Sequence, residues 1–135
     1  MASITVIRPV VVKAIVTENF KDLYRRELEE ALRRVEEVLN QIETQLRRLD
    51  LERQVSPQSR GLRQQLELER TRQEMVRAEL RDRLREAENL VLNSEFPQTT
   101  VDSQLEIRVG DNLFSKLTRT EIVVKDGIVM EIRQG

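Results

Sequence analysis

Two long segments between residues 20 and 92 repeat apolar residues at alternating steps of three and four, a spacing that puts them on one face of a helix. In the first segment the stripe consists of Leu28, Leu32, Val35, Leu39, Ile42, Leu46 and Leu49. In the second the same spacing runs through Leu62, Leu66, Glu69, Gln73, Val76, Leu80, Arg83, Ala87 and Leu90, of which Glu69, Gln73 and Arg83 are charged or polar. Two such stripes predict a pair of helices that pack against each other as a coiled coil.

The stretch between the two segments holds residues that interrupt helices and residues that begin them. Pro57 and Gly61 are expected to break the helical pattern. Ser56 and Ser59 are candidates to cap the second helix. A turn near residues 54–61 is short, so we expect the two helices to be antiparallel neighbours.

Charge gives a second indication of how the helices align. The residues that flank the stripe are acidic in the first helix and mostly basic in the second. An antiparallel alignment places these opposite charges together as Asp50 with Arg63, Glu43 with Arg70, and Glu36 with Arg77. The residue numbers have the same sum in each pair, which a hairpin requires. Exposed pairs contribute only about 0.2 to 1 kcal/mol each, so they specify the register more than they stabilise the hairpin.

Both ends of the chain carry strand patterns. Residues 10–16 carry apolar side chains on both faces of a predicted strand, which is typical of a strand that is covered on both sides or that lies at a subunit interface. Residues 104–109 alternate strictly between apolar and polar, as a half-exposed strand does. A polar linker is expected between Pro97 and this second strand.

The last two apolar runs predict a hairpin around residues 125–127. A two-residue turn at 126–127 would mix apolar and charged residues on each face. A three-residue loop with Gly127 in the left-handed conformation keeps the faces separate, and the pattern therefore favours it. This pairing assigns to the buried face Ile122, Val124, Ile128 and Met130.

These patterns predict an α+β fold, in which a long antiparallel two-helix coiled-coil hairpin is joined to a small β-module. Residues 1–17 would supply the N-terminal strand of the module, residues 18–93 the hairpin, and residues 94–135 the three C-terminal strands. Four strands barely suffice for a barrel. The pattern leaves open whether the module closes into one.

Composition excludes several kinds of chemistry. The chain has no Cys, His or Trp, which removes thiolate and imidazole metal sites, cysteine nucleophiles and histidine acid–base catalysis. Its 23 basic and 24 acidic residues create no net field for nucleic acid or an anionic membrane. The apolar run at residues 10–16 is too short to span a bilayer. We therefore expect a cytoplasmic protein that is not an enzyme and that needs no cofactor or metal.

Some residues that the hairpin and the module do not require are candidates for function. The turn carboxylates Asp111, Asp126 and Glu131 are interpreted as turn-forming or solvated groups rather than a metal or catalytic site. An apolar helix stripe broader than one partner needs is typical of a further helix or a second subunit. The candidate interface residues are Val11, Ile15, Tyr24, Ala31, Val38, Leu68 and Met75.

The segments Val11–Glu18, Glu106–Leu113 and Glu121–Ile132, around a hairpin rich in Arg, Glu, Leu and Gln, resemble the YlqD family of uncharacterised bacterial proteins. The resemblance covers nearly the whole chain. Its specificity comes from the terminal segments, because any coiled coil matches the middle. It implies a bacterial cytoplasmic protein and transfers no activity and no functional residue.

Three classes of function remain. The first is an interaction or scaffold protein, a homo-oligomer whose β-modules associate and whose helical hairpins project as arms toward an unknown protein partner. The alternative is an RNA- or ribosome-associated accessory factor that uses the β-module, which would need a basic surface. An enzyme ranks third and would need a pocket with convergent carboxylates. We expect self-association and neither nucleic acid nor membrane as a partner.

Overall fold

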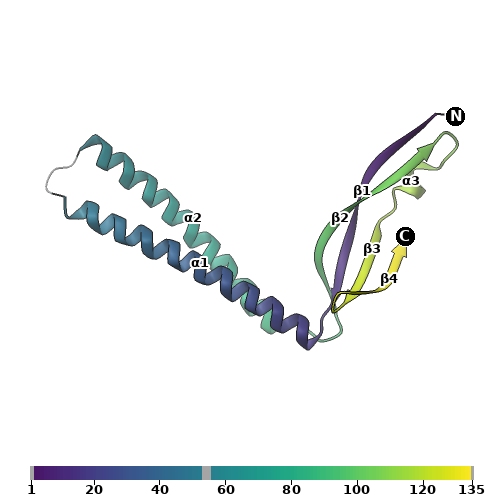
Figure 1. Cartoon of the computed structure of the whole chain (residues 1–135), viewed down its shortest axis with the longest axis horizontal. Helices are drawn as coiled ribbons and strands as arrows, with labels where there is room; N and C mark the ends of the chain where they lie inside the picture. The colour runs from purple at the N-terminus through teal and green to yellow at the C-terminus, as the bar shows by residue number, and fades with distance from the viewer. Residues whose placement is uncertain (1, 53–55, 135) are drawn as a thin grey trace. The chain divides into compact units, whose positions relative to one another are not determined.

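The computed structural model describes residues 2–52 and 56–134, which form two compact units (Figure 1). The helical unit, within residues 22–89, contains most of α1 (Glu18–Asp50) and all of α2 (Pro57–Glu88). The sheet unit, drawn from residues 1–21 and 90–135, contains the remaining elements, namely β1 (Ser3–Ile15), β2 (Glu95–Arg108), α3 (Leu113–Lys116), β3 (Thr120–Lys125) and β4 (Ile128–Gln134). The predicted α+β fold is confirmed.

The apolar stripe of α1 is buried as predicted. Its buried residues are Leu28, Val35, Leu39, Ile42 and Leu46. The stripe of α2 differs from the prediction, because Val76 is 41% exposed and Arg83 is exposed as well. From Leu66 onward its half-buried or buried positions are Leu66, Glu69, Arg70, Gln73, Arg77, Leu80, Leu84 and Ala87, so five predicted residues are kept and Arg70, Arg77 and Leu84 are added. Two arginines can occupy this stripe because their aliphatic stems pack while the guanidinium groups reach outward.

The start of α2 shows why Pro57 and Gly61 do not break the helix. Ser56 is the N-cap, and its hydroxyl oxygen accepts a hydrogen bond of 3.0 Å from the backbone N–H of Ser59. Pro57 then occupies the first helical position, where its missing N–H leaves no hydrogen bond unmade. Gly61 lies inside the helix. Residues 54 and 55 of the predicted turn lie outside the described residues.

The ion pairs between the helices confirm the antiparallel register. Asp50 pairs with Arg63, and Nη1 of Arg70 lies 3.1 Å from Oε1 of Glu43, both as predicted. The third prediction is wrong, because Glu36 pairs with Arg81, at 3.6 Å, rather than with Arg77. Arg77 is half-buried, whereas Arg81, one helical turn farther on, is exposed.

These contacts predict a selective coupling on the helical surface. In a double-mutant cycle with Glu36→Gln and Arg81→Gln, we expect a coupling of about 0.2 to 1 kcal/mol in the free energy of unfolding at low salt. The matched cycle with Glu36→Gln and Arg77→Gln should show a smaller coupling. Urea unfolding of the single and double variants measures both. A larger coupling with Arg77 would contradict the observed register.

The sheet has the strand order β2-β1-β3-β4 and is open, with β2 and β4 at its edges. The strand β1 is antiparallel to β2 along its whole length and parallel to β3 only from Val10 to Ala14 (Figure 1). Strand β1 therefore begins earlier than predicted, and the polar linker expected after Pro97 is part of β2. Pro9 lies just before the stretch that pairs with β3, where its missing N–H is tolerated.

The hairpin between β3 and β4 has a tighter turn than predicted. Lys125 pairs with Ile128, so the turn consists of two residues, and both have positive φ, +47° at Asp126 and +84° at Gly127. This Asp-Gly turn matches the natural twist of two antiparallel strands. A two-residue turn alone would place apolar residues of β3 opposite charged residues of β4. The register shifts between Val123 and Val124, where Met130 is an extra residue of β4, and this shift restores the pairing of apolar with apolar residues.

The core of the sheet unit is small. Its buried apolar residues are Val10, Ala14, Val16 and Val123. Val16 connects the N-terminal and C-terminal parts of the sheet unit through two backbone hydrogen bonds of 2.8 Å each. Its N–H donates to the carbonyl of Ser94, and its carbonyl accepts from the N–H of Asn93. The ring of Phe20 packs on Phe96 with centroids 5.4 Å apart. Among the described residues, no helix is long and apolar enough to cross a membrane.

Candidate functional site

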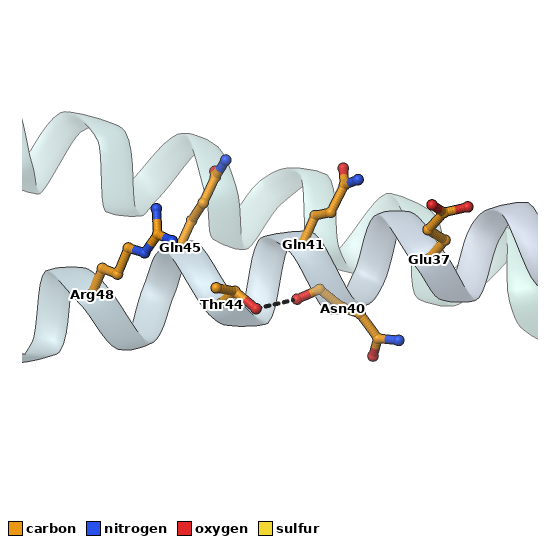
Figure 2. A pocket seen from close by; sticks show the side chains of 6 residues that line it. All are labelled: Glu37, Asn40, Gln41, Thr44, Gln45 and Arg48. Carbon is orange, nitrogen blue, oxygen red and sulfur yellow. Dashed lines mark hydrogen bonds between the residues drawn. The ribbon is translucent and has the colours of Figure 1, made fainter.

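The surface of the helical unit has a hollow lined by polar and charged side chains of α1. A space of about 390 Å³ is lined by Glu37, Asn40, Gln41, Thr44, Gln45 and Arg48. Figure 2 shows that all six side chains come from one helix and that Asn40 points away from the others. Thr44 Oγ1 donates a hydrogen bond to the carbonyl of Asn40. Across the described residues, no cluster of three or more Asp or Glu side chains could hold a metal ion.

The two faces of the sheet differ in chemistry. Residues paired across neighbouring strands point to the same face, so the register assigns each side chain to one of them. The apolar face carries Val10, Val12, Ala14, Phe96, Val101, Ile122, Val124, Val129 and Ile132. The ionic face carries Lys13, Glu95, Glu121, Glu131 and Arg133, together with Val11 and Ile15.

The sheet unit exposes more large apolar side chains than it buries. The exposed ones are Ile4, Ile7, Val91, Leu92, Val101, Val109, Leu113, Phe114, Leu117, Ile128, Val129, Met130 and Ile132. Single exposed apolar residues are common, but a set of this size on a small unit is typical of an interaction surface. The sheet, rather than the helical hairpin, is therefore the main candidate surface.

One part of this surface is the free end of the β1–β2 ribbon. Over Ser3–Pro9, β1 pairs with β2 but not with β3. The hollow at its end, about 290 Å³, is lined by Ala2, Ser3, Ile4, Ile107, Arg108 and Val109. The guanidinium of Arg8 donates a hydrogen bond of 3.0 Å to the carbonyl of Lys116, and this bond connects α3 to the ribbon. A two-stranded ribbon is marginally stable by itself, so this end gains most from a covering partner.

The second part is β4, the edge strand at the other side of the sheet. Ile128, Val129, Met130 and Ile132 are each between 56% and 67% exposed. The prediction that Ile128 and Met130 are buried is wrong, because the two-residue turn changes their pairing and no further strand covers them. The sequence did hold a sign of this apolar edge, because four apolar residues lie close together in the last strand of the chain.

On the ionic face, a network of charges covers Val123, which is only 2% exposed. The two Nη atoms of Arg133 donate to both carboxylate oxygens of Glu95, at 3.0 and 2.5 Å. Lys13 Nζ lies 3.0 Å from Glu121, and Arg133 lies 3.7 Å from the same carboxylate. Because Glu95 belongs to β2 and Arg133 to β4, this pair connects the two edge strands across the face of the sheet.

The turn carboxylates stabilise local structure. Asp111 Oδ2 lies 2.8 Å from Lys116 Nζ and accepts a hydrogen bond of 2.8 Å from the backbone N–H of Arg108. These two contacts hold the pKa of the Asp111 carboxyl below its usual value. Asp126 Oδ1 accepts from the hydroxyl of Thr17 at 2.7 Å, which ties the last hairpin to the start of α1. Glu131 pairs with Arg133 at 3.1 Å.

The candidate interface residues lie in three places. Val11 and Ile15 are half-buried on the ionic face of the sheet. Tyr24, Ala31 and Val38 are half-buried along one side of α1. Leu68 and Met75 are exposed on α2, at 57% and 69%. The candidate residues are therefore divided between the sheet unit and the helical unit, and the sequence reasoning missed the apolar edge of β4.

A family model and a relative of known name both indicate one family. The model of the family described as YlqD protein matches residues 4–133. A relative in Bacillus subtilis (strain 168), called "Uncharacterized protein YlqD", is 47% identical over 45 residues, which are 33% of this chain and 35% of the relative's length. A crystal structure of a protein of unknown function from Synechococcus sp. WH 8102 has a TM-score of 0.83 and 26% identity, and the match covers 98% of this chain and 95% of that one.

The Glu95–Arg133 pair makes the stability of the sheet dependent on pH. The hydrogen bond from Arg133 lowers the pKa of Glu95 below its usual value. A carboxyl with a lowered pKa in the folded state stabilises that state above its unfolded pKa and loses this effect as the pH falls through the folded pKa. In thermal unfolding, we therefore expect the wild-type chain to exceed Glu95→Gln in melting temperature at pH 7. The difference should shrink toward pH 3, and a constant difference would contradict the assignment.

Proposed function

The chain belongs to the YlqD family, and we propose that it acts as a non-enzymatic interaction or scaffold protein, a homo-oligomer joined through its sheet units. In this proposal the helical hairpins serve as arms that bind a protein partner. The observation that carries it is the imbalance in the sheet unit, where four buried apolar residues support a surface with many exposed apolar ones.

Physical chemistry supports self-association of the sheet. Each large apolar side chain gains roughly 1.5 to 3 kcal/mol when it moves from full exposure to full burial. A small unit with few buried residues is close to the size at which a single core is marginal. A second copy is the partner always present at matching concentration, and symmetric self-association is the commonest assembly of soluble proteins.

The helical hairpin supports the partner-binding part of the proposal. The α2 residues Leu68, Met75 and Val76 are exposed, although charged and polar residues surround them. Apolar side chains at such spacing on one helix suit a partner helix or groove. The alternative, an RNA- or ribosome-associated factor, has less support, because Lys13, Arg119 and Arg133 of the sheet pair with carboxylates of this same chain.

Light scattering coupled to gel filtration tests the self-association. At tens of micromolar protein, we expect a mass at least twice the 15.9 kDa of one chain. The variant Ile4→Glu should shift the mass toward one chain if the ribbon end takes part, whereas Glu106→Gln serves as a control on the exposed surface of the same ribbon. A monomer mass for the wild-type chain would overturn the proposal.

Affinity capture from a bacterial lysate tests the role of the hairpin. The variant Leu68→Glu/Met75→Glu should lose captured proteins that the wild-type chain retains, because two charges interrupt the apolar surface of α2. The matched control Thr71→Glu/Ala78→Glu adds the same charge at exposed positions with the same spacing and should retain them. Equal capture by both variants would remove α2 as the binding surface.

A further inference from the structure

We propose that the free edge of β4 pairs antiparallel with β4 of a second copy of this chain, with Ile132 opposite Ile132 of that copy. Two sheets would then join into one continuous sheet. This inference rests on the proposed self-association and specifies the surface and the register by which two copies meet. Three features of the described residues support this pairing, namely the difference between the two sheet edges, the charges of β4 and the irregularity of β4.

The two edges of the sheet differ in how well they resist pairing. Natural edge strands avoid unwanted pairing through Pro, charged residues and irregularities. The edge strand β2 carries Pro97, an irregularity in its register next to Gln98, and Asp102 within its length. The edge strand β4 also has an irregularity, at Met130, but it has neither Pro nor Gly from Ile128 to Gln134 and four of its apolar side chains are exposed. Its charges, Glu131 and Arg133, are of opposite sign and can therefore pair across two copies. The edge open to a new strand is therefore that of β4.

Symmetry restricts the possible registers. A two-fold axis perpendicular to the sheet keeps the apolar faces of both copies on one side and pairs antiparallel strands about a central residue. A centre at Glu131 would place this carboxylate opposite its own copy, and like charges directly opposite are destabilising. A centre at Met130 would place the irregular part of β4 at the axis.

A centre at Ile132 avoids both problems. It places Glu131 of each copy opposite Arg133 of the other, so that two complementary pairs form across the axis. The side chains of Glu131 and Arg133 are 53% and 40% exposed. Arg133 already contacts Glu95 and Glu131, and its five N–H donors allow it to bind a further carboxylate.

This register also extends the apolar face. Ile132 pairs with Ile122 within one chain, and its copy would lie directly beside it across the new strand pair. Met130 would lie opposite Gln134 of the other copy. The pairing is centred on residues 131–133, which lie in β4 beyond the irregular residue Met130. Charge complementarity and apolar contact thus select the same alignment.

Disulfide cross-linking tests the pairing cleanly, because the chain contains no Cys. Residues opposite each other in an antiparallel pair have Cα atoms at a separation that a disulfide spans. Under mild oxidation at micromolar concentration, we expect Ile132→Cys to cross-link at least about tenfold faster than Gln98→Cys on the β2 edge, because paired thiols have an effective concentration of about millimolar order. The variants Met130→Cys and Gln134→Cys should cross-link with each other when mixed and slowly when alone.

The outcomes separate this inference from the proposed function. A wild-type mass of one chain would overturn both. An oligomer mass with equal rates for Ile132→Cys and Gln98→Cys would overturn the β4 pairing and leave self-association through another surface in place. Fast cross-linking of Met130→Cys alone, with slow cross-linking of Ile132→Cys, would overturn the register.

Discussion

The pairing of β1 with two strands from the opposite end of the sequence is the constraint on which the fold depends. β1 binds β2 along its whole length and β3 along its second half. Such a ladder would ordinarily require the closure of a long loop, which costs conformational entropy. Here the intervening residues form two antiparallel helices, which reverse the direction of the chain. The backbone hydrogen bonds of Val16 with Asn93 and Ser94 then hold the end of β1 beside the start of β2.

The sequence predicted the features that follow from simple periodicity. The heptad stripe located the antiparallel helices, and their charges gave two correct ion pairs, Asp50 with Arg63 and Glu43 with Arg70. The third pair failed because periodicity does not say which arginine on one side of a helix turns inward. The length of β2 was missed because Thr99, Thr100 and Asp102 read as a polar linker, although a strand with one solvated side accommodates such residues.

Irregular backbone explains the remaining errors. The last hairpin has a two-residue turn followed by an extra residue, whereas the pattern of alternating residues favoured a three-residue loop. Both arrangements restore the alternation, but they expose different side chains, so Ile128 and Met130 were wrongly assigned to the interior. The charge network of Lys13, Glu95, Glu121 and Arg133 was not predicted because it brings together four strands whose order the sequence does not reveal.

The separation of β1 from its partners along the chain has a consequence for synthesis. Roughly eighty residues follow Ile15 before β2 begins at Glu95, and at 5 to 20 residues per second a ribosome needs about 4 to 16 seconds to make them. During that time β1 is an apolar strand without a partner. Each helix forms within microseconds of its synthesis, because its backbone hydrogen bonds are local. The hairpin can therefore form as soon as α2 ends at Glu88, before the strands of the sheet that follow it are made. A delay between Ile15 and Glu95 would thus lengthen the interval in which β1 is open to aggregation.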